Sequence, residues 1–208
     1  MNIDKIYYIN LKQRKDRLNH VRKQLVNVGL IDQAERFEAI KISSGAVGCT
    51  MSHIKCLEKA KENNYNSVMI VEDDICFEDN EQFKKSLDTI LKLKFKWDVC
   101  LLGGNTLPPI VKINSSCART FYTQTTTGYI VQKHYYNTLI NNMKEGVIKL
   151  MQEPTNKTHF AVDRYWLQLQ KNDYWILLMP QIVSQLPDYS DVEEKEIDYT
   201  ELFHRQLT

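Results

Sequence analysis

Three consecutive carboxylates follow an apolar run in the first half of the chain. Residues 68–71 are Val-Met-Ile-Val, and Glu72, Asp73 and Asp74 come directly after them. Such a run is typical of a strand buried on both faces, so the acidic side chains lie at its carboxyl end, where open α/β sheets bind ligands. Because adjacent like charges repel one another, they need a cation, and Mg²⁺ or Mn²⁺ held between carboxylates and substrate phosphates fits best. A solvated acidic turn is the alternative that this run alone leaves open.

Basic residues follow the first expected strand. Residues 5–9 are a short apolar run ending in Asn10, and Arg14, Lys15 and Arg17 come where the next helix begins. Backbone N–H groups and the helix dipole favour anions there, and arginine binds phosphate in a bidentate manner. Arg14 and Arg17 are therefore candidates for a uridine or diphosphate contact. An ordinary solvated helix face is the alternative, and it is the better interpretation of Lys15.

His53 lies on an expected helix with two cysteines. It shares one face with Cys49 and Leu57, the pattern of a half-buried core face, so a core histidine bonded to the backbone is its first interpretation. Cys49, His53 and Cys56 also suggest zinc, but three potential ligands on one helix without a fourth make a poor tetrahedral site. We therefore do not assign His53 to a metal.

Strand-like and helix-like segments alternate along the chain. Strands are expected at residues 5–9, 36–40, 68–71, 97–102, 121–132 and 174–179, and helices at 18–28, 43–63, 83–91, 135–143 and 162–170. Residues 105–117 are expected to form a loop because they contain two prolines and several Ser and Asn residues. The alternation predicts an α/β fold with a mostly parallel central sheet flanked by helices. We expect one domain over residues 1–187 and an acidic C-terminal tail over residues 188–208.

Composition narrows the class of protein. The 208 residues are 43% hydrophobic, which suffices for one well-packed domain, and the formal net charge of +1 gives no general attraction to nucleic acid or anionic membranes. No run of eighteen apolar residues predicts a membrane span. Five cysteines without a CxxC pair indicate reduced thiols, and the amino terminus lacks a signal-peptide pattern. We therefore expect a cytoplasmic protein, in the host cytoplasm if the source is a virus.

Seven short motifs occur in a fixed order along nearly the whole chain. They are Tyr7–Leu11 with Arg14, Asp16 and Arg17; Gly48–His53; Val71–Asp74; Trp97–Gly103; Thr127–Val131; Val162–Asp163; and Pro180, Gln185 and Ser190–Val192. Each motif alone is weak evidence for a family. In this order, the set resembles the motifs of glycosyltransferase family 25, the lipo-oligosaccharide and collagen galactosyltransferase group. The high content of Asn and Lys would suit an AT-rich genome, bacterial or giant-viral.

The resemblance implies a GT-A-like nucleotide-binding domain that transfers a hexose from a UDP-sugar to a hydroxyl of a glycan or glycoprotein. It implies inversion at the sugar and dependence on Mn²⁺ or Mg²⁺, which would neutralise charge on the departing diphosphate. The residues it assigns to the donor are Asn10, Arg14, Arg17, His53, Glu72 and Asp73. Those it assigns to the metal are Asp74, Glu72 and Asp191. It leaves the sugar, the acceptor and the oligomeric state open.

Two late carboxylates are candidates for the catalytic base that an inverting transfer requires. Asp163 lies near a helix start, where a structural aspartate paired with Arg164 is the alternative. Asp191 follows the last strand, where an acidic tail residue is the alternative. We predict that Asp163 is the base and Asp191 a metal-shell residue. Tyr129 and Trp166 are further candidates for stacking on a sugar or a nucleobase.

Three other classes of protein fit parts of the sequence. A catalytically silent nucleotide-sugar-binding protein would lose acidic motifs that this chain keeps. A metal-dependent phosphohydrolase generally requires further His or Asp ligands around a second metal ion, and the five histidines here are scattered along the sequence. A nucleotidyltransferase of similar fold usually has a glycine-rich loop after the first strand, and residues 10–17 contain no glycine.

Overall fold

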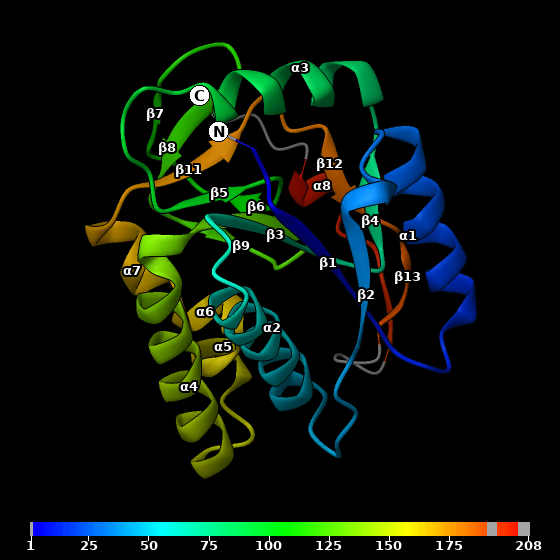
Figure 1. Ribbon diagram of the computed structural model, residues 1–208. Helices are drawn as coiled ribbons and strands as arrows, with labels where there is room; N and C mark the ends of the chain where they lie inside the picture. Colours follow the sequence, from blue (N-terminus) through cyan, green and yellow to red (C-terminus); the bar gives the residue numbers. More distant parts are fainter. Residues whose placement is uncertain (1, 191–194, 204–208) are drawn as a thin grey trace.

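The buried apolar runs of the sequence form the strands of an eight-stranded sheet in a computed structural model, which describes residues 2–190 and 195–203 (Figure 1). The order of strands across the sheet is β2-β1-β3-β10-β5-β11-β8-β7. Their bounds are β1 Lys5–Asn10, β2 Ala34–Glu38, β3 Ser67–Glu72, β5 Val99–Leu101, β7 Ile110–Lys112, β8 Cys117–Thr120, β10 Gly128–Gln132 and β11 Trp175–Leu178.

Most strands of this sheet point in one direction. β1 pairs in parallel with β2 and β3, and β5 pairs in parallel with β11. β10 lies between β3 and β5 and is antiparallel to both, while β8 is antiparallel to β11. The predicted α/β class with a mostly parallel sheet is therefore confirmed. Because β10 runs the opposite way, the residues that precede it lie at the carboxyl end of β3.

Helices cover both faces of the sheet. Their bounds are α1 Lys15–Asn27, α2 Gly45–Glu62, α3 Asn80–Leu91, α4 Tyr136–Gln152, α5 Lys157–Phe160, α6 Val162–Tyr165, α7 Leu167–Asn172 and α8 Thr200–Phe203, with 3₁₀ turns at Ile31–Gln33 and Lys133–Tyr135. Alternate residues of β1 face opposite sides, so Ile6 packs with residues of α1 and α3 while Tyr7 packs with residues of α2 and α4. In Figure 1, α3 accordingly lies above the sheet and α2 and α4 lie below it.

Three two-stranded sheets accompany the main one. They pair β4 Ile75–Phe77 with β12 Val183–Gln185, β6 Asn105–Thr106 with β9 Thr123–Gln124, and β13 Asp188–Ser190 with β14 Lys195–Ile197. The pairing of β4 with β12 sets Gln185 opposite Ile75, which brings a late residue beside the acidic strand end. This is the tertiary contact that matters most for the site.

The structure corrects several expected elements. The expected loop 105–117 contains β6, β7 and the first residue of β8. β7 and β8 form a hairpin, and the pairing of β8 with β11 and of β6 with β9 supplies hydrogen bonds that a local pattern does not reveal. The single strand expected at 121–132 is two strands separated by residues 125–127, and the helix expected at 162–170 is split into α6 and α7. In the segment predicted as a tail, β13 and β14 form a hairpin; the division at residue 187 stays a prediction.

The five cysteines are free thiols, as the sequence predicts. Among residues 2–190 and 195–203, no helix combines the length and the apolar character that crossing a bilayer requires.

Candidate active site

The three carboxylates lie at the carboxyl end of β3, as predicted, and their side chains diverge. Glu72 Oε2 and Asp74 Oδ1 both face Gln185 Nε2, at 3.3 and 3.5 Å. Asp73 instead accepts a hydrogen bond of 2.7 Å from Asn10 Nδ2. Glu72 and Asp74 therefore share one side of the strand end, and Asp73 is held against the end of β1.

Arg17 of α1 connects the acidic strand end to the C-terminal hairpin. Its Nη1 lies 3.3 Å from Asp73 Oδ1 and 3.1 Å from Asp74 Oδ2. Its Nε donates to Asp188 Oδ2 at 3.0 Å, and its Nη2 donates to the Tyr189 carbonyl at 2.9 Å. Only 10% of the Arg17 side chain is exposed, so one buried guanidinium balances carboxylates from distant parts of the chain.

Arg14 lies beside Arg17 and away from the acidic strand end. It pairs with Asp16 at 2.8 Å and also with Asp188. Asn10 has a supporting position as well, since its Oδ1 accepts from Arg36 Nε at 3.0 Å while its Nδ2 holds Asp73. Arg14 therefore helps to hold Asp188, and Asn10 helps to hold Asp73.

Glu72 is held by three side chains from other elements. Its Oε1 accepts a hydrogen bond of 2.8 Å from Thr126 Oγ1 and lies 3.4 Å from His53 Nε2 and 3.7 Å from Cys49 Sγ. His53 is fully buried, as the core-histidine interpretation expects, but its partners are Glu72 and the Tyr129 hydroxyl rather than the backbone. The histidine therefore supports the acidic group directly.

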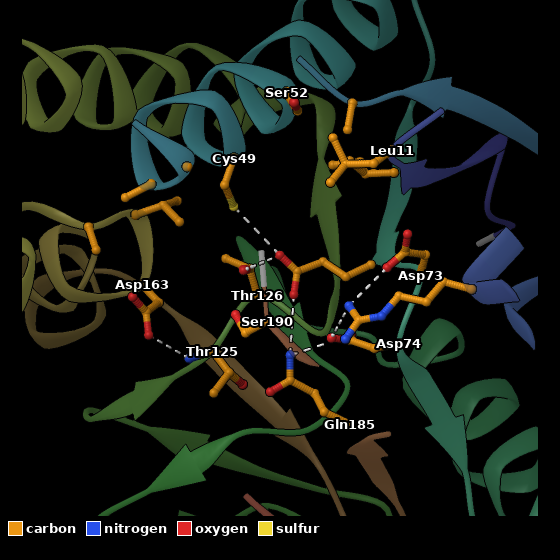
Figure 2. A pocket seen from close by; sticks show the side chains of 18 of the residues that line it. Leu11, Cys49, Ser52, Asp73, Asp74, Thr125, Thr126, Asp163, Gln185 and Ser190 are labelled. Atoms are coloured by element: carbon orange, nitrogen blue, oxygen red, sulfur yellow. Dashed lines mark hydrogen bonds and ion pairs between the residues drawn. The ribbon is translucent and has the colours of Figure 1, made fainter. Parts of the chain in front are cut away.

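Gln185 has a place in the site that its sequence motif did not reveal. Its Nε2 bridges Glu72 and Asp74, while its Oε1 is buried and has no hydrogen-bond partner among the described residues. Since buried polar atoms are normally satisfied, the unpaired Oε1 stands out, although it lies on the side of the amide that faces away from the two carboxylates (Figure 2). Only the pairing of β12 with β4 reveals this role.

A pocket of about 650 Å³ opens over these groups. Figure 2 shows Asp73 and Asp74 on one side of it, with Asp163 and Thr125 on the opposite side. The start of α2 and residues 39–43 line it from one direction, and residues of the C-terminal segment, including Tyr189 and Leu202, line it from another. This size suits a small-molecule ligand, and the lining combines apolar surface with convergent charges.

Asp163 lies in α6 and faces the pocket half-buried. Its Oδ2 accepts a hydrogen bond of 3.0 Å from the Thr125 backbone N–H. Thr125 has a left-handed φ of 80°, which is strained for a β-branched residue, so Asp163 stabilises an unusual turn. The N-cap of α6 is Ala161, and Asp163 is therefore not a helix cap.

The pKa values of the carboxylates diverge across the pocket. Burial, together with the charges of Glu72 and Asp73, raises the pKa of Asp74 to about 7. Burial also works to raise the pKa of Glu72, but hydrogen bonds from His53 and Thr126 outweigh it and the pKa of Glu72 is lowered. Burial raises the pKa of Asp163, although the Thr125 N–H opposes this shift. Carboxylates with pKa values shifted in opposite directions are typical of functional sites.

The structure brings together most of the residues singled out from the sequence. Those lining the pocket are Arg17, Glu72, Asp73, Asp74 and Asp163. Asn10 and His53 contact Asp73 and Glu72 from outside the pocket lining. Arg14 pairs with Asp188, which also pairs with Arg17. Asp191 lies outside the described residues. The expectation that Tyr129 and Trp166 stack on a ligand is wrong, because both rings are fully buried in the core.

The donor atoms fit a hard divalent cation. Glu72 and Asp74 supply carboxylate oxygens, and a half-turn of the Gln185 amide would exchange Nε2 for Oε1 beside them; such oxygens are the ligands that Mg²⁺ and Mn²⁺ prefer. Burial and the neighbouring carboxylates raise the pKa of Asp74 although Arg17 opposes the shift. A cation bound beside Asp74 would stabilise its charged form.

Comparison with known proteins agrees with this geometry. Residues 31–164 match the family model of glycosyltransferase family 25 (LPS biosynthesis protein). Human procollagen galactosyltransferase 2 is 26% identical over 133 residues, covering 50% of this chain and 21% of that protein. A probable inactive glycosyltransferase 25 family member 3 from Rattus norvegicus is 31% identical over 70 residues, covering 33% of this chain and 12% of that protein. The matched regions thus span 21% and 12% of these two relatives.

A solved structure supports the fold. It is a glycosyltransferase involved in glycosylation of the major capsid of PBCV-1, with a TM-score of 0.50 at 10% identity over 86% of this chain and 93% of that chain. The fold, with its mixed sheet flanked by helices, is therefore GT-A-like. Since the family model covers well over half of the chain, the chain belongs to glycosyltransferase family 25.

Proposed function

We propose that the protein is a metal-dependent glycosyltransferase that transfers a hexose from a UDP-sugar to a hydroxyl group of a glycan or glycoprotein, with inversion. The observation that carries the proposal is the pocket with Asp74 on one side and Asp163 on the opposite side (Figure 2). An inverting transfer needs charge compensation on one side of the reacting carbon and a base on the other, and the pocket offers both. We propose a cytoplasmic setting for this reaction.

Asp74 and Glu72 would hold the divalent cation, with Asp191 as a third carboxylate from the C-terminal segment and, after a half-turn of its amide, Gln185 Oε1 as a further oxygen. When bound, the cation neutralises the negative charge that develops on the departing diphosphate. Asp73 has a different role in this proposal. Its hydrogen bond of 2.7 Å from Asn10 and its contact with Arg17 fix the strand end, so that Glu72 and Asp74 keep their orientation.

Arg17 would bind the diphosphate of the donor. Its guanidinium lines the pocket and lies between Asp74 and Asp188, and arginine recognises phosphate oxygens through parallel N–H bonds. A bound diphosphate would compete with these carboxylates for its N–H groups. The hydrogen bond from Arg17 Nη2 to the Tyr189 carbonyl would keep the side chain in place during this exchange.

Asp163 would remove the proton from the acceptor hydroxyl. It faces the pocket from the side opposite Asp74, and its hydrogen bond from Thr125 occupies Oδ2. The second oxygen, Oδ1, is then the atom that accepts the proton. Burial raises the pKa of Asp163, and a higher pKa makes the carboxylate a stronger base.

A screen of nucleotide sugars tests this proposal. We expect binding and slow hydrolysis of a UDP-sugar in the presence of Mn²⁺, loss of both in EDTA, and loss of both in Asp74→Asn. Asp88→Asn is the matched control, because Asp88 is an exposed carboxylate on α3, 61% exposed and paired with Lys92. A folded protein that binds no nucleotide sugar with Mn²⁺, or an Asp74→Asn variant as active as the parent, would overturn the proposal. Release of pyrophosphate instead of UDP would identify a nucleotidyltransferase, and metal-dependent binding without turnover a silent member of the family.

A further inference from the structure

A second group of metal-binding side chains lies next to the acidic strand end. Cys49 and His53 are four residues apart on α2, so they lie on the same face of the helix. That face meets the end of β3, where Glu72 completes the group. The sulfur, imidazole nitrogen and carboxylate oxygen all lie within 4.8 Å of one another.

The distances in this group match the edges of a zinc tetrahedron. Typical zinc bond lengths to nitrogen, oxygen and sulfur give ligand separations of about 3.4 Å for N···O and about 3.6 Å for S···O at tetrahedral angles. His53 Nε2 lies 3.4 Å from Glu72 Oε1, and Cys49 Sγ lies 3.7 Å from the same oxygen. Two of the three edges therefore need almost no rearrangement to accept a metal.

The surroundings of His53 already orient it as a ligand. Its Nδ1 lies 2.9 Å from the hydroxyl oxygen of Tyr129, and the two rings stack with centroids 5.6 Å apart. With a cation bound, Nδ1–H would donate to that hydroxyl and the lone pair of Nε2 would face the cation, in place of the hydrogen bond that Nε2 makes to Glu72 in the metal-free protein. Histidine ligands of metals characteristically make a hydrogen bond of this kind through the other ring nitrogen. His53 is fully buried, so its ring has little freedom to turn away.

We propose that Cys49, His53 and Glu72 form a site for a thiophilic divalent cation of the Zn²⁺ class. Cys49 and Glu72 line the pocket, so a fourth coordination position faces it and is open to water or a ligand. Three protein ligands with one open position are the arrangement of catalytic rather than structural zinc sites. On binding, the Cys49 thiol transfers its proton to the solvent as the S–Zn bond forms.

Glu72 belongs to both metal sites, so the two cations compete for it. An ion held by Cys49 and His53 removes Glu72 from the oxygen ligands around Asp74, and Zn²⁺ therefore inhibits the Mn²⁺-dependent reaction. This consequence rests on the proposed function. The binding of the thiophilic cation does not, since it is measured without a sugar donor or turnover.

The other cysteines provide an internal comparison. Cys76 Sγ lies 3.6 Å from His20 Nε2, but among the described residues no carboxylate completes this pair to a group of three metal ligands. Cys56 is packed in the core below the sheet. In the part of the chain that the structure describes, Cys49, His53 and Glu72 form the one group of three such ligands. Cys76→Ser is therefore the matched control for Cys49→Ser, because both cysteines are half-buried and contact a histidine or a carboxylate.

The experiment is a titration of the EDTA-treated full chain with Co²⁺ and with Zn²⁺. We expect one equivalent of Co²⁺ to give the thiolate-to-cobalt charge-transfer band of a tetrahedral site, and Zn²⁺ to displace it. Cys49→Ser and His53→Gln should each weaken Zn²⁺ binding by at least about 100-fold, and Tyr129→Phe by about 10- to 100-fold. Cys76→Ser and Asp74→Asn should bind Zn²⁺ as the parent does. Thermal unfolding without metal checks that each variant is folded.

The outcomes separate this site from the oxygen site. Cys49→Ser should lose Zn²⁺ binding and weaken Mn²⁺-dependent binding of UDP far less than Asp74→Asn does, whereas Asp74→Asn should keep Zn²⁺ binding and lose the binding of UDP. Absence of a thiolate–cobalt band in the folded parent, or equal Zn²⁺ affinity of Cys49→Ser and the parent, would overturn the inference. If Zn²⁺ binds as expected while no nucleotide sugar is bound, the metal site stands and the proposed function fails.

Discussion

Replacing Asp163 by Asn distinguishes a catalytic base from a residue that only holds a turn. Asparagine keeps the shape of the side chain and an oxygen that accepts the hydrogen bond from the Thr125 N–H, now 3.0 Å from Oδ2. It cannot take up a proton. The left-handed turn at Thr125 should therefore survive in Asp163→Asn, while proton removal from the acceptor is lost.

The expected loss of transfer is about 10²–10⁴-fold, the usual contribution of a general base. This corresponds to about 3–5 kcal/mol of transition-state stabilisation. Stability should change little, because burial already disfavours the charged form of Asp163, and its pKa is raised accordingly. Asp163→Ala is the contrasting variant. It leaves the Thr125 N–H without its acceptor beside a strained φ of 80°, which should cost about 1–3 kcal/mol of folding free energy.

The assay measures three quantities on one preparation of each variant: transfer rate, UDP affinity with Mn²⁺, and unfolding free energy. For Asp163→Asn we expect a low transfer rate, with UDP affinity and stability near those of the parent. The pH profile adds a fourth reading. Since the base must be ionised and burial raises the pKa of Asp163, transfer by the parent should fall as the pH decreases through this raised pKa. The transfer rate of Asp163→Asn should not show this decrease at low pH.

Two results would refute the assignment of the base. If Asp163→Asn transfers sugar at the parental rate while remaining folded, Asp163 only stabilises the turn. If the variant loses metal-dependent UDP binding instead, Asp163 belongs to the donor side of the site. In either case Asp191 becomes the candidate to test.

Three further predictions concern the donor side and the fold. Arg17→Ala should weaken UDP binding by about 1–3 kcal/mol, or roughly 5- to 150-fold, and Arg14→Ala by less because Arg14 lies outside the pocket lining; calorimetry that finds equal effects would contradict this. Gly48→Ala should destabilise the protein by about 1–3 kcal/mol, because its Cβ would lie 2.4 Å from the Ile40 carbonyl oxygen; an unchanged urea midpoint would show that residues 39–43 can move away. In EDTA, stability should fall as pH rises from 3.8 to about 7, since the folded state keeps the proton on Asp74 longer than the unfolded state does. Asp74→Asn should remove up to about 4 kcal/mol of this dependence, and urea unfolding that follows the same pH dependence in both proteins would contradict it.

Local patterns in the sequence were enough to locate the elements that carry the site. The run at residues 68–71 identified β3 because a strand covered on both faces needs apolar side chains at every position. Helical spacing of apolar residues identified α1 and α3 for the same reason of burial. The carboxylates followed β3 directly, so their place at the edge of the sheet needed no tertiary information.

Long-range pairing decided what surrounds those carboxylates. Gln185 meets Glu72 and Asp74 only because β12 pairs with β4, more than a hundred residues earlier in the chain. Thr126 reaches Glu72 because β10 enters the sheet antiparallel between β3 and β5, which no periodicity predicts.

The same distinction separates the two metal sites. The sequence alone grouped Cys49, His53 and Cys56 by their spacing on one helix, and found no fourth ligand. In the folded protein Glu72 lies beside Cys49 and His53, whereas Cys56 is buried in the hydrophobic core. Burial periodicity is encoded by neighbouring residues and can be read from them. The convergence of side chains from separate elements depends on how whole elements pack, and only the tertiary structure determines it.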